Sequence, residues 1–181
     1  MRSLYFTLCF SVLSSTAAWA QIETQRIVEP IPQINTQNNY RVSADQTPSG
    51  FAVPRYVSLK FTKVNARTGP SRDHPIAYQY QRRGLPVMIV AETEMWRKIR
   101  DISGDEAWVR KPALSGSRTV IALNPTSLRK KPKADAREIA RTESNTVLKL
   151  ESCNETGWCE VRSEGGFKGW TRKIDLWGAD L

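Results

Sequence analysis

The chain has few residues of the types that catalysis and metal binding use. Among its 181 residues there is one histidine, His74, and there are three cysteines. A cysteine–histidine nucleophile would need a free thiolate close to the histidine, and Cys153 and Cys159 stand far from it in the sequence. The sequence contains no nucleophile elbow and no cluster of histidines and cysteines at metal-ligand spacing. We therefore expect a protein that is not an enzyme and that has no cofactor and no metal site.

Long hydrophobic runs are also absent, apart from one near the N-terminus. There Arg2 precedes an apolar run over residues 4–13, and Ala18-Trp19-Ala20 follows as a small-x-small site. The run is shorter than the roughly 20 residues that span a bilayer. These features are typical of a secretory signal peptide over residues 1–20, cleaved after Ala20, with an uncleaved anchor as the alternative. We expect an exported chain that has no transmembrane segment after cleavage.

Cleavage would remove Cys9 and leave an even number of cysteines, Cys153 and Cys159. In an exported chain an even number favours a disulfide, because no glutathione pool keeps the thiols reduced. The two residues flank a short turn between two predicted strands. Facing residues of a hairpin lie about 4.5–5.5 Å apart, which is within disulfide range. We predict a Cys153–Cys159 bond.

Residues 21–53 differ in composition from the rest of the chain. Gln, Asn, Thr and Pro dominate this segment, and its few apolar residues follow neither a helical nor a strand period. Such a segment buries too little surface to offset the entropy of ordering it. We predict a flexible polar arm over residues 21–53 that acts as a spacer, with Phe51 to Val53 in a position to lie along the first folded module.

The rest of the chain consists of two copies of one sequence pattern. An offset of 62 residues places Trp96 on Trp158 and Trp108 on Trp170. The same offset also relates Arg67 to Arg129, Pro70 to Pro132, Ile99 to Val161, Arg110 to Arg172, Leu114 to Leu176 and Gly116 to Gly178. Between the prolines and the first tryptophans the register slips by one residue and then recovers, as a loop insertion would cause. This duplication predicts two domains, over residues 54–118 and 119–181.

Each copy has the pattern of short strands separated by turns. Five strands are expected in each, at 57–64, 77–81, 87–92, 96–101 and 106–110, then at 120–123, 138–141, 147–151, 158–162 and 169–172. Five short strands at this spacing are typical of a small, partly open barrel. Only residues 133–141, which are rich in alanine, suggest a helical turn. The predicted fold class is therefore all-β.

Several of these residues resemble a known family. The stretch VNARTGPS at residues 64–71 resembles the opening signature of the bacterial SH3-like domain, as do Trp96, Trp108-Val109 and Leu114. The second copy departs from the signature at 127–132, where it keeps the Arg and the Pro but lacks the Asn and the Gly. The resemblance is to the tandem type that proteobacteria export. It implies two SH3-like barrels after the signal peptide and the arm, and it implies a place in the periplasm.

Strand parity bears on the role of the tryptophans. Successive side chains of a strand alternate between its two faces, so residues an odd number apart lie on opposite faces. If Ile99 and Val109 point into the barrel, Trp96 and Trp108 point out of it. Outward tryptophans are either packed under a loop or exposed in a ligand groove, and the sequence leaves both open. Trp177, near the chain end, is expected to pack between the copies.

The positive charge is concentrated in the first copy. Residues 55–118 have a net charge of +7, and residues 119–181 have a net charge of +2. A one-sided excess attracts anions, and arginine binds a carboxylate through two parallel hydrogen bonds. The candidate ligand-binding residues lie in this copy: Arg67, Tyr78, Tyr80, Arg82, Arg83, Trp96 and Trp108.

These observations and the family resemblance together favour one class of function. We expect an exported, non-catalytic binding module of the cell envelope that recognises peptidoglycan or its peptides. The alternative is a protein–protein adaptor, in which a barrel groove holds an extended peptide of an envelope protein. Nucleic acid is not an expected partner outside the cytoplasm.

Overall fold

The computed structural model describes residues 41–180, which belong to one compact unit. The predicted signal peptide and most of the predicted arm lie outside the described residues. Three 3-10 turns occur within 41–180, η1 (Ala44–Gln46), η2 (Lys111–Ala113) and η3 (Lys173–Asp175). The described part of the chain contains no helix that is long and apolar enough to cross a membrane.

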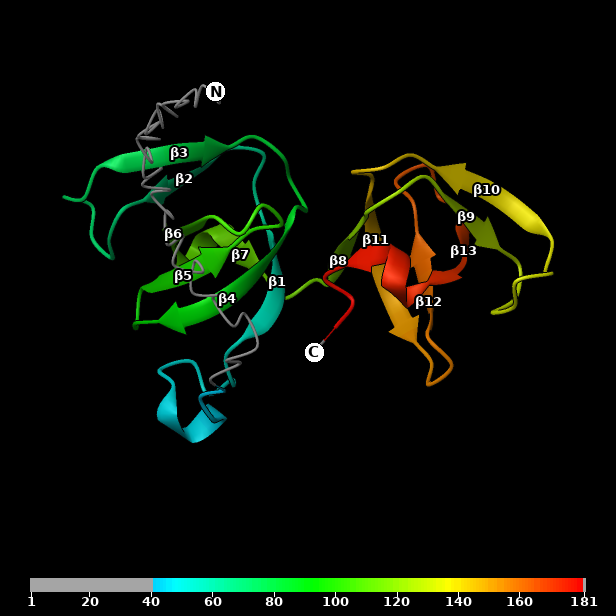
Figure 1. Ribbon diagram of the computed structural model, residues 1–181. Helices are drawn as coiled ribbons and strands as arrows, with labels where there is room; N and C mark the ends of the chain where they lie inside the picture. The colour runs from blue at the N-terminus through cyan, green and yellow to red at the C-terminus, as the bar shows by residue number, and fades with distance from the viewer. Residues whose placement is uncertain (1–40, 181) are drawn as a thin grey trace, which may run out of the picture. The chain divides into compact units, whose positions relative to one another are not determined.

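The strands form two antiparallel sheets of seven strands each (Figure 1). The first sheet contains β1 (Arg55–Leu59), β2 (Val64–Arg67), β3 (Ile76–Tyr80), β4 (Pro86–Glu92), β5 (Trp96–Arg100), β6 (Glu106–Arg110) and β7 (Leu114–Ser115). The second contains β8 (Thr119–Ala122), β9 (Thr126–Arg129), β10 (Glu138–Thr142), β11 (Val147–Cys153), β12 (Trp158–Arg162), β13 (Lys168–Arg172) and β14 (Leu176–Trp177).

The two sheets have the same topology. The first has the strand order β3-β2-β6-β5-β4-β1-β7, and the second has the order β10-β9-β13-β12-β11-β8-β14. Each strand of the second sheet thus occupies the place of the strand seven earlier in the chain. The predicted fold class, two tandem SH3-like barrels, is confirmed. We refer to them as barrel 1 and barrel 2.

The strand predicted over residues 57–64 is in fact two strands, β1 and β2. Leu59 and Val64 are both buried in the core of barrel 1. They are an odd number of residues apart, so one continuous strand would place them on opposite faces. The chain turns between them, although this turn contains neither glycine nor proline. In the second copy the strand predicted at 120–123 is β8, and β9 and the short strands β7 and β14 were not predicted. At 133–141 a single hydrogen-bonded turn precedes β10, in which the N–H of Ala136 donates to the carbonyl of Lys133 at 3.2 Å.

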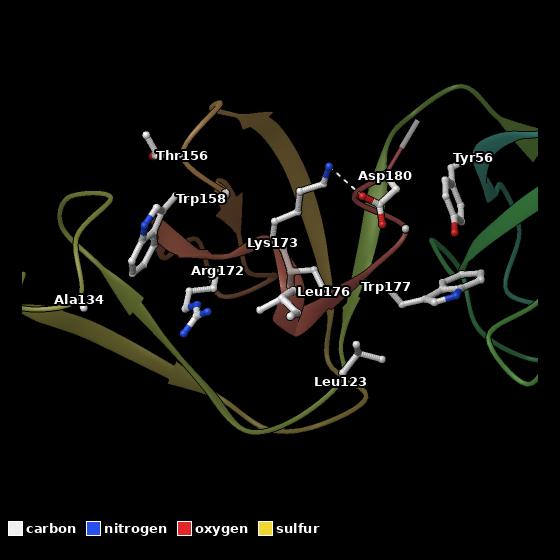
Figure 2. A pocket seen from close by; sticks show the side chains of 13 residues that line it. Tyr56, Leu123, Ala134, Thr156, Trp158, Arg172, Lys173, Leu176, Trp177 and Asp180 are labelled. Atoms are coloured by element: carbon white, nitrogen blue, oxygen red, sulfur yellow. Dashed lines mark ion pairs between the residues drawn. The ribbon is translucent and has the colours of Figure 1, made fainter. Parts of the chain in front are cut away.

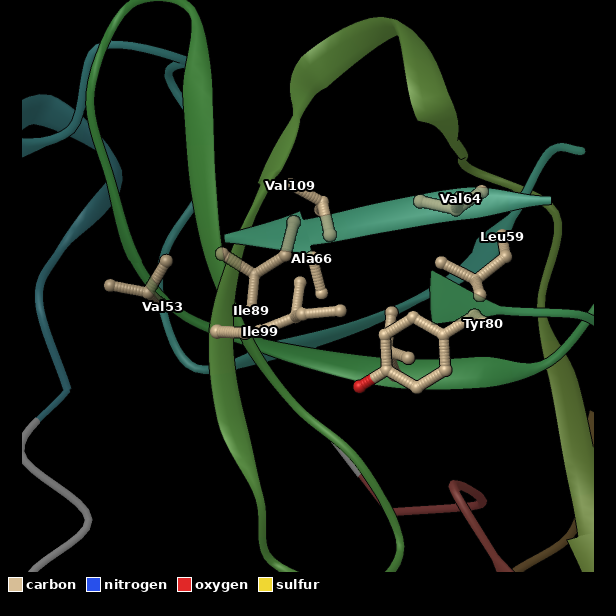
Figure 3. Close-up of a cluster of buried hydrophobic side chains, with 10 residues drawn as sticks. Val53, Leu59, Val64, Ala66, Tyr80, Ile89, Ile99 and Val109 are labelled. Atoms are coloured by element: carbon tan, nitrogen blue, oxygen red, sulfur yellow. The ribbon is translucent and has the colours of Figure 1, made fainter. Parts of the chain in front are cut away.

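Each barrel has its own hydrophobic core. In barrel 1 the core contains Leu59, Val87, Ile89, Ile99 and Val109, all almost fully buried (Figure 3). In barrel 2 the corresponding cluster consists of Val120, Leu128, Leu148, Cys159, Val161, Leu176 and Ala179. Neither cluster contains a tryptophan. Ile99 and Val109 therefore point inward, as the parity argument assumed.

The register slip that the sequence shows has a structural cause. The loop between β3 and β4 has five residues, whereas the corresponding loop between β10 and β11 has four. The next turn, between β4 and β5, has three residues, whereas the turn between β11 and β12 has four, so the offset returns to 62. Both hairpins have a β-bulge at the same place, after Ile89 and after Leu150. The turn between β1 and β2 has four residues, whereas the turn between β8 and β9 has three, so the two copies differ by one residue in each of three turns.

The two hairpins are closed in different ways at their turn ends. In barrel 1, Glu92 faces Arg97, and the Nε of Arg97 lies 3.1 Å from a carboxylate oxygen of Glu92. In barrel 2 the equivalent facing pair is Cys153 and Cys159, and these residues form the predicted disulfide. Arg97 and Cys159 are both buried. The turn end of the hairpin is therefore held together by an ion pair in barrel 1 and by a disulfide in barrel 2.

The end of the predicted arm is packed against barrel 1. Val42 forms a β-bridge with Val53, and Val53 belongs to the core of barrel 1. The backbone N–H of Ser49 donates a hydrogen bond of 2.9 Å to Glu92. Residues 41–53 are therefore folded, in contrast to the flexible arm expected over 21–53. The reason is that Val42 and Val53 reach apolar surface that only the folded barrel provides.

Candidate functional site

A small groove occurs at the same place in both barrels. In barrel 1 it has a volume of about 220 Å³, and its lining residues are Lys63, Val64, Asn65, Arg67, Arg72, Trp96, Arg110 and Ala113. In barrel 2 it has a volume of about 310 Å³, and its lining residues are Pro125, Thr126, Ser127, Arg129, Ala134, Trp158, Thr171, Arg172 and Asp175. We call these hollows groove 1 and groove 2.

The two grooves correspond position by position. All eight positions that line groove 1 recur 62 residues later among the lining residues of groove 2, where only Thr171 is added. The repeated fold therefore builds the same hollow twice. A tryptophan and two arginines are common to both copies.

Strand pairing places the tryptophan beside an arginine. Trp96 is the first residue of β5 and faces Arg110, the last residue of β6. In barrel 2, Trp158 faces Arg172 in the same way. Facing residues of an antiparallel pair project from the same side of the sheet. Each groove therefore has an indole and a guanidinium side by side, on the side opposite the core.

The second shared arginine holds the loop that borders the groove. The guanidinium of Arg67 donates a hydrogen bond of 2.6 Å to the backbone carbonyl of His74. Arg129 donates a hydrogen bond of 2.8 Å to the carbonyl of Ala136, again 62 residues later. The arginine that both copies keep thus fixes the loop between β2 and β3, or between β9 and β10. Arg67 is among the predicted ligand-binding residues and does line groove 1.

The glycine of the sequence signature has a packing role in this loop. The ring of His74 lies so close to Gly69 that a Cβ there would stand 2.2 Å from its Cδ2. The Ser71 hydroxyl lies 2.9 Å from Nδ1 of His74 and fixes the ring from the other side. Only glycine leaves room for this arrangement. The second copy has no glycine at the equivalent position, Lys131, and no histidine at Ala136.

The two grooves differ in charge. Groove 1 has four cationic lining residues, Lys63, Arg67, Arg72 and Arg110, and none of its lining residues is acidic. In groove 2 the first and third of these positions are Pro125 and Ala134, and Asp175 adds a negative charge. The net charge of the lining residues is therefore +4 in groove 1 and +1 in groove 2. The copies have kept the shape of the groove and diverged in its charge.

The tryptophans lie on the outer face, and their surroundings differ. Trp96 lines groove 1 but is only 8% exposed. Trp158 lines groove 2 and is half-buried. Trp108 is half-buried, faces Lys98 and Arg67, and does not line groove 1. Trp96 is therefore a largely covered wall of groove 1, and its role in ligand binding stays a prediction.

The two predicted tyrosines face inward. Tyr80 belongs to the core of barrel 1, and its hydroxyl donates a hydrogen bond of 3.0 Å to Asp101. Tyr78 packs against the same core, and its ring meets that of Tyr80 edge to face. Burial and the hydrogen bond with Tyr78 raise the pKa of Tyr80. Neither tyrosine lines groove 1, because both pair across β2 with core residues, Tyr80 with Val64 and Tyr78 with Ala66.

The other predicted cations do not gather at groove 1. Arg82 donates a hydrogen bond of 2.8 Å to the carbonyl of Asn145, in barrel 2. Arg82 and Arg83 line a separate hollow of about 620 Å³. Arg97 is buried beside Glu92. The cationic residues of groove 1 that sequence reasoning did not select are Lys63, Arg72 and Arg110. The offset of 62 could have pointed to Arg110, because Arg172 repeats it.

The family of the chain follows from comparison with known proteins. A family model of the bacterial SH3 domain matches residues 60–116 and again residues 123–178. The two matches together cover more than half of the chain. The chain belongs to the bacterial SH3 domain family. Groove 1 and groove 2 lie within the first and the second SH3 domain, respectively.

More remote similarities extend to solved structures. The structures of NlpC2 and NlpC1 from Trichomonas vaginalis are each 15% identical to the chain, with TM-scores of 0.33 and 0.32. They match 69% and 68% of this chain, and 48% and 45% of their own lengths. An NlpC/P60 family protein from Bacillus cereus ATCC 10987 is 17% identical with a TM-score of 0.31, over 67% of this chain and 55% of its own.

The chain thus spans about half of the length of these solved structures. Their similarity is too remote to indicate function. No curated protein matches the chain.

A larger cavity adjoins groove 2 in the second SH3 domain. It has a volume of about 730 Å³ and shares Ala134, Trp158 and Arg172 with groove 2 (Figure 2). At its other side Trp177 meets Tyr56 of the first SH3 domain edge to face, with ring centroids 5.1 Å apart. Trp177 therefore packs between the copies, as expected. Trp158 is half-buried and lines both hollows.

The described residues offer no metal site. Within residues 41–180 there is no group of three or more His, Cys, Asp or Glu side chains placed to hold an ion. His74 is held by the loop of the first SH3 domain, and the two cysteines outside the N-terminal segment are joined to each other. The side chains that line the two grooves offer positive charge, hydrogen-bonding groups and aromatic surface.

Proposed function

We propose that the protein is an exported, non-catalytic binding module of the cell envelope that recognises peptidoglycan through the carboxylates of its peptides. The observation that carries this proposal is groove 1, where four cations surround a tryptophan and no lining residue is acidic. Arginine side chains bind carboxylates through paired, charge-assisted hydrogen bonds. Peptides of the cell wall present such carboxylates outside the cytoplasm, where nucleic acid is not available.

The membership of the family supports a place in the cell envelope. The expected signal peptide over residues 1–20, with cleavage after Ala20, supports export to the periplasm. Removal of the N-terminal segment on export is checked by mass spectrometry of the secreted chain. A chain that keeps residues 1–20 would contradict the cleavage site.

The role of groove 1 is tested by binding of the purified protein to peptidoglycan sacculi. Replacing Lys63 and Arg72 together by Gln removes two cations that only groove 1 has. Exposed charge pairs contribute about 0.2–1 kcal/mol each, so we expect binding to weaken by about fivefold. Binding of the unchanged protein should itself weaken as salt rises, because exposed charges are screened.

A matched control removes the same charge elsewhere in the first SH3 domain. The double variant Lys60→Gln and Arg83→Gln changes two exposed cations that do not line groove 1. It should bind sacculi almost as the unchanged protein does. If both double variants weaken binding equally, the general field of the domain acts rather than groove 1, and the proposed site is wrong.

A peptide adaptor is the second candidate, and groove 2 favours it. Trp158 is more exposed than Trp96, the local charge is small, and an extended cavity with apolar residues such as Leu176 and Trp177 adjoins it. Such a surface suits an extended peptide of an envelope protein. Binding through it should change little with salt. Trp158→Ala should abolish it without affecting the sedimentation with sacculi.

A further inference from the structure

A third hollow in the first SH3 domain lies apart from groove 1. It has a volume of about 410 Å³ and shares no lining residue with groove 1. It lies between the folded segment before β1 and strands of barrel 1. We call it the Arg55–Arg97 pocket, after the two arginines that line it. Its volume is within the range of small-molecule sites.

Much of the wall of this pocket is apolar. Val57, Ile89 and Leu114 line it from the barrel, and Tyr56 adds an aromatic face. Phe51, from the segment before β1, lines it from the other side and is 64% exposed. The guanidinium of Arg55 lies over the Phe51 ring, 5.6 Å from its centroid. The pocket thus has room for an apolar group, and an exposed aromatic ring stands at its edge.

The polar side of the pocket carries an excess of positive charge. Arg55 and Arg97 both line it, and both pair with the single carboxylate of Glu92, at 2.6 Å and 3.1 Å. The same carboxylate also accepts a hydrogen bond from the Ser49 N–H. Arg97 has a side chain that is only 3% exposed. Two guanidinium groups thus share one negative charge, and Lys111 adds a third cation to the lining.

The electrostatic surroundings of Arg97 indicate that the one carboxylate does not balance the positive charge of the two arginines. Burial lowers the pKa of Arg97, Glu92 opposes that change, and the neighbouring Arg55 lowers it further. A second carboxylate at this place would stabilise both guanidinium groups. Buried cations that are paired and hydrogen-bonded are far less costly than unpaired ones.

The second SH3 domain closes the equivalent hairpin without the ion pair of Glu92 and Arg97. There the disulfide stands in place of the Glu92–Arg97 pair. Arg118 lies opposite Leu150, as Arg55 lies opposite Ile89, so Arg118 stands at the position of Arg55. Arg97 is thus the arginine that the first domain adds at this place, because barrel 2 has Cys159 there. The combination of two arginines and an apolar wall occurs in only one of the two copies.

The geometry points to a binding site for a small amphipathic carboxylate, with the carboxylate on Arg55 and Arg97 and the apolar body against Ile89, Leu114 and Tyr56. The inference does not depend on the function of groove 1. A fatty acid and the C-terminal residue of an apolar peptide share this chemistry. The experiment below distinguishes these two sources.

The test is calorimetric titration of the purified protein with acetate, butyrate, hexanoate and octanoate. Each added methylene should tighten binding by up to about fourfold until the pocket is full. Octanamide, which has no charge, should bind at least about tenfold more weakly than octanoate. N-acetyl-leucine is titrated in parallel. Tighter binding than hexanoate indicates a peptide terminus as the source, and weaker binding indicates an acyl chain.

Two variants locate the site. Arg55→Gln removes one cation, and Gly116→Leu places a side chain at the pocket, where a Cβ on residue 116 meets nothing within 4 Å. Both should reduce octanoate affinity by at least about tenfold. The control Lys63→Gln removes a cation from groove 1 and should leave octanoate binding unchanged. Since Arg55 also holds the segment before β1, Gly116→Leu keeps the test valid if Arg55→Gln loosens that segment.

Several results would overturn the inference. They are the absence of octanoate binding, equal affinities for octanoate and octanamide, or unchanged affinity in Gly116→Leu. A loss of binding in Lys63→Gln but not in Gly116→Leu would assign the carboxylate to groove 1 instead. Sacculi binding by Gly116→Leu is measured alongside, so that a failure of this pocket and a failure of groove 1 are told apart.

Discussion

Removing the charge of Glu92 should destabilise the first SH3 domain far more than removing an exposed charge. Glu92 has a side chain only 2% exposed and accepts hydrogen bonds or ion-pair contacts from Ser49, Arg55 and Arg97. Glu92→Gln leaves the Arg97 guanidinium buried without its anion. Breaking a buried pair in this way costs about 3–5 kcal/mol. We expect the lower end, about 3 kcal/mol, because Arg97 keeps hydrogen bonds to the carbonyls of Thr93 and Trp96.

The measurement must report on the first domain alone. Native-state hydrogen exchange of the Ile99 and Val109 amides, both in the core strands of barrel 1, does so. A loss of about 3 kcal/mol corresponds to exchange more than a hundredfold faster. The control Glu106→Gln affects a carboxylate that pairs with Lys98 and Arg100 but is 27% exposed. It should cost less than about 1 kcal/mol.

The same reasoning predicts a dependence on pH. Burial alone would raise the pKa of Glu92, but hydrogen bonds from Ser49 and Arg55 and the charge of Arg55 outweigh it, so the pKa is lowered. A carboxyl with a lowered pKa in the folded state stabilises the fold above its ordinary value of 4.5 and loses that effect as pH falls through the folded value. The difference between the unchanged protein and Glu92→Gln should therefore shrink as pH falls below 4.5.

Two outcomes would refute this account of the ion pair. One is a loss of less than about 1 kcal/mol in Glu92→Gln at neutral pH. The other is a difference that stays constant from pH 7 to pH 2. The double variant Glu92→Gln and Arg97→Met gives a further check. It should recover most of the loss, because apolar groups of similar volume replace buried ion pairs at little cost.

Three further predictions concern other parts of the two domains. Replacing both cysteines by alanine should lower the free energy of unfolding of the second domain by about 2 kcal/mol, measured by hydrogen exchange, and a loss confined to the first domain would contradict it. Gly69→Ala should lower the free energy of unfolding by about 1 kcal/mol, measured by urea unfolding, because the added methyl group clashes with the His74 ring. Adding His74→Ala should restore that stability. If the effects of the two substitutions simply add, the clash is refuted. Tyr80→Phe should cost about 1.5 kcal/mol at neutral pH through loss of the hydrogen bond to Asp101. Because the pKa of Tyr80 is raised by burial, the unchanged protein should lose stability as pH rises above about 10, and Tyr80→Phe should lose less.

The fold could be predicted from the sequence because the duplication gave two independent copies of one pattern. Trp96 and Trp158, with Trp108 and Trp170, fixed the offset before any strand was assigned. The outer placement of Trp96 also followed, since parity with Ile99 is a local property of one strand. The disulfide was predictable for the same reason, because its two residues lie in one hairpin.

Properties that depend on which strands pair were not predictable. Tyr78 and Tyr80 lie beside arginines in the sequence, but their register against β2 turns them toward the core. Lys63 and Arg110 are far apart in the chain and meet at groove 1 only because β2 lies next to β6. The burial of Arg97 also depends on a neighbour across the hairpin, because Arg97 is paired there with Glu92. The face of a strand on which a residue lies could be predicted from the sequence. The residue that lies opposite it on the neighbouring strand could not.

The two hairpins are closed by different residue pairs, an ion pair in barrel 1 and a disulfide in barrel 2. This difference affects how a chain with two similar domains avoids pairing the wrong strands. Tandem domains of the same topology risk exchanging equivalent strands during folding. If β5 took the place of β12, Cys153 would face Arg97, and Glu92 would face Cys159. Neither the ion pair nor the disulfide could then form, and a carboxylate and a guanidinium would be buried without partners. The residue pair that closes each hairpin therefore favours the pairing of strands from the same domain over the pairing of strands from different domains.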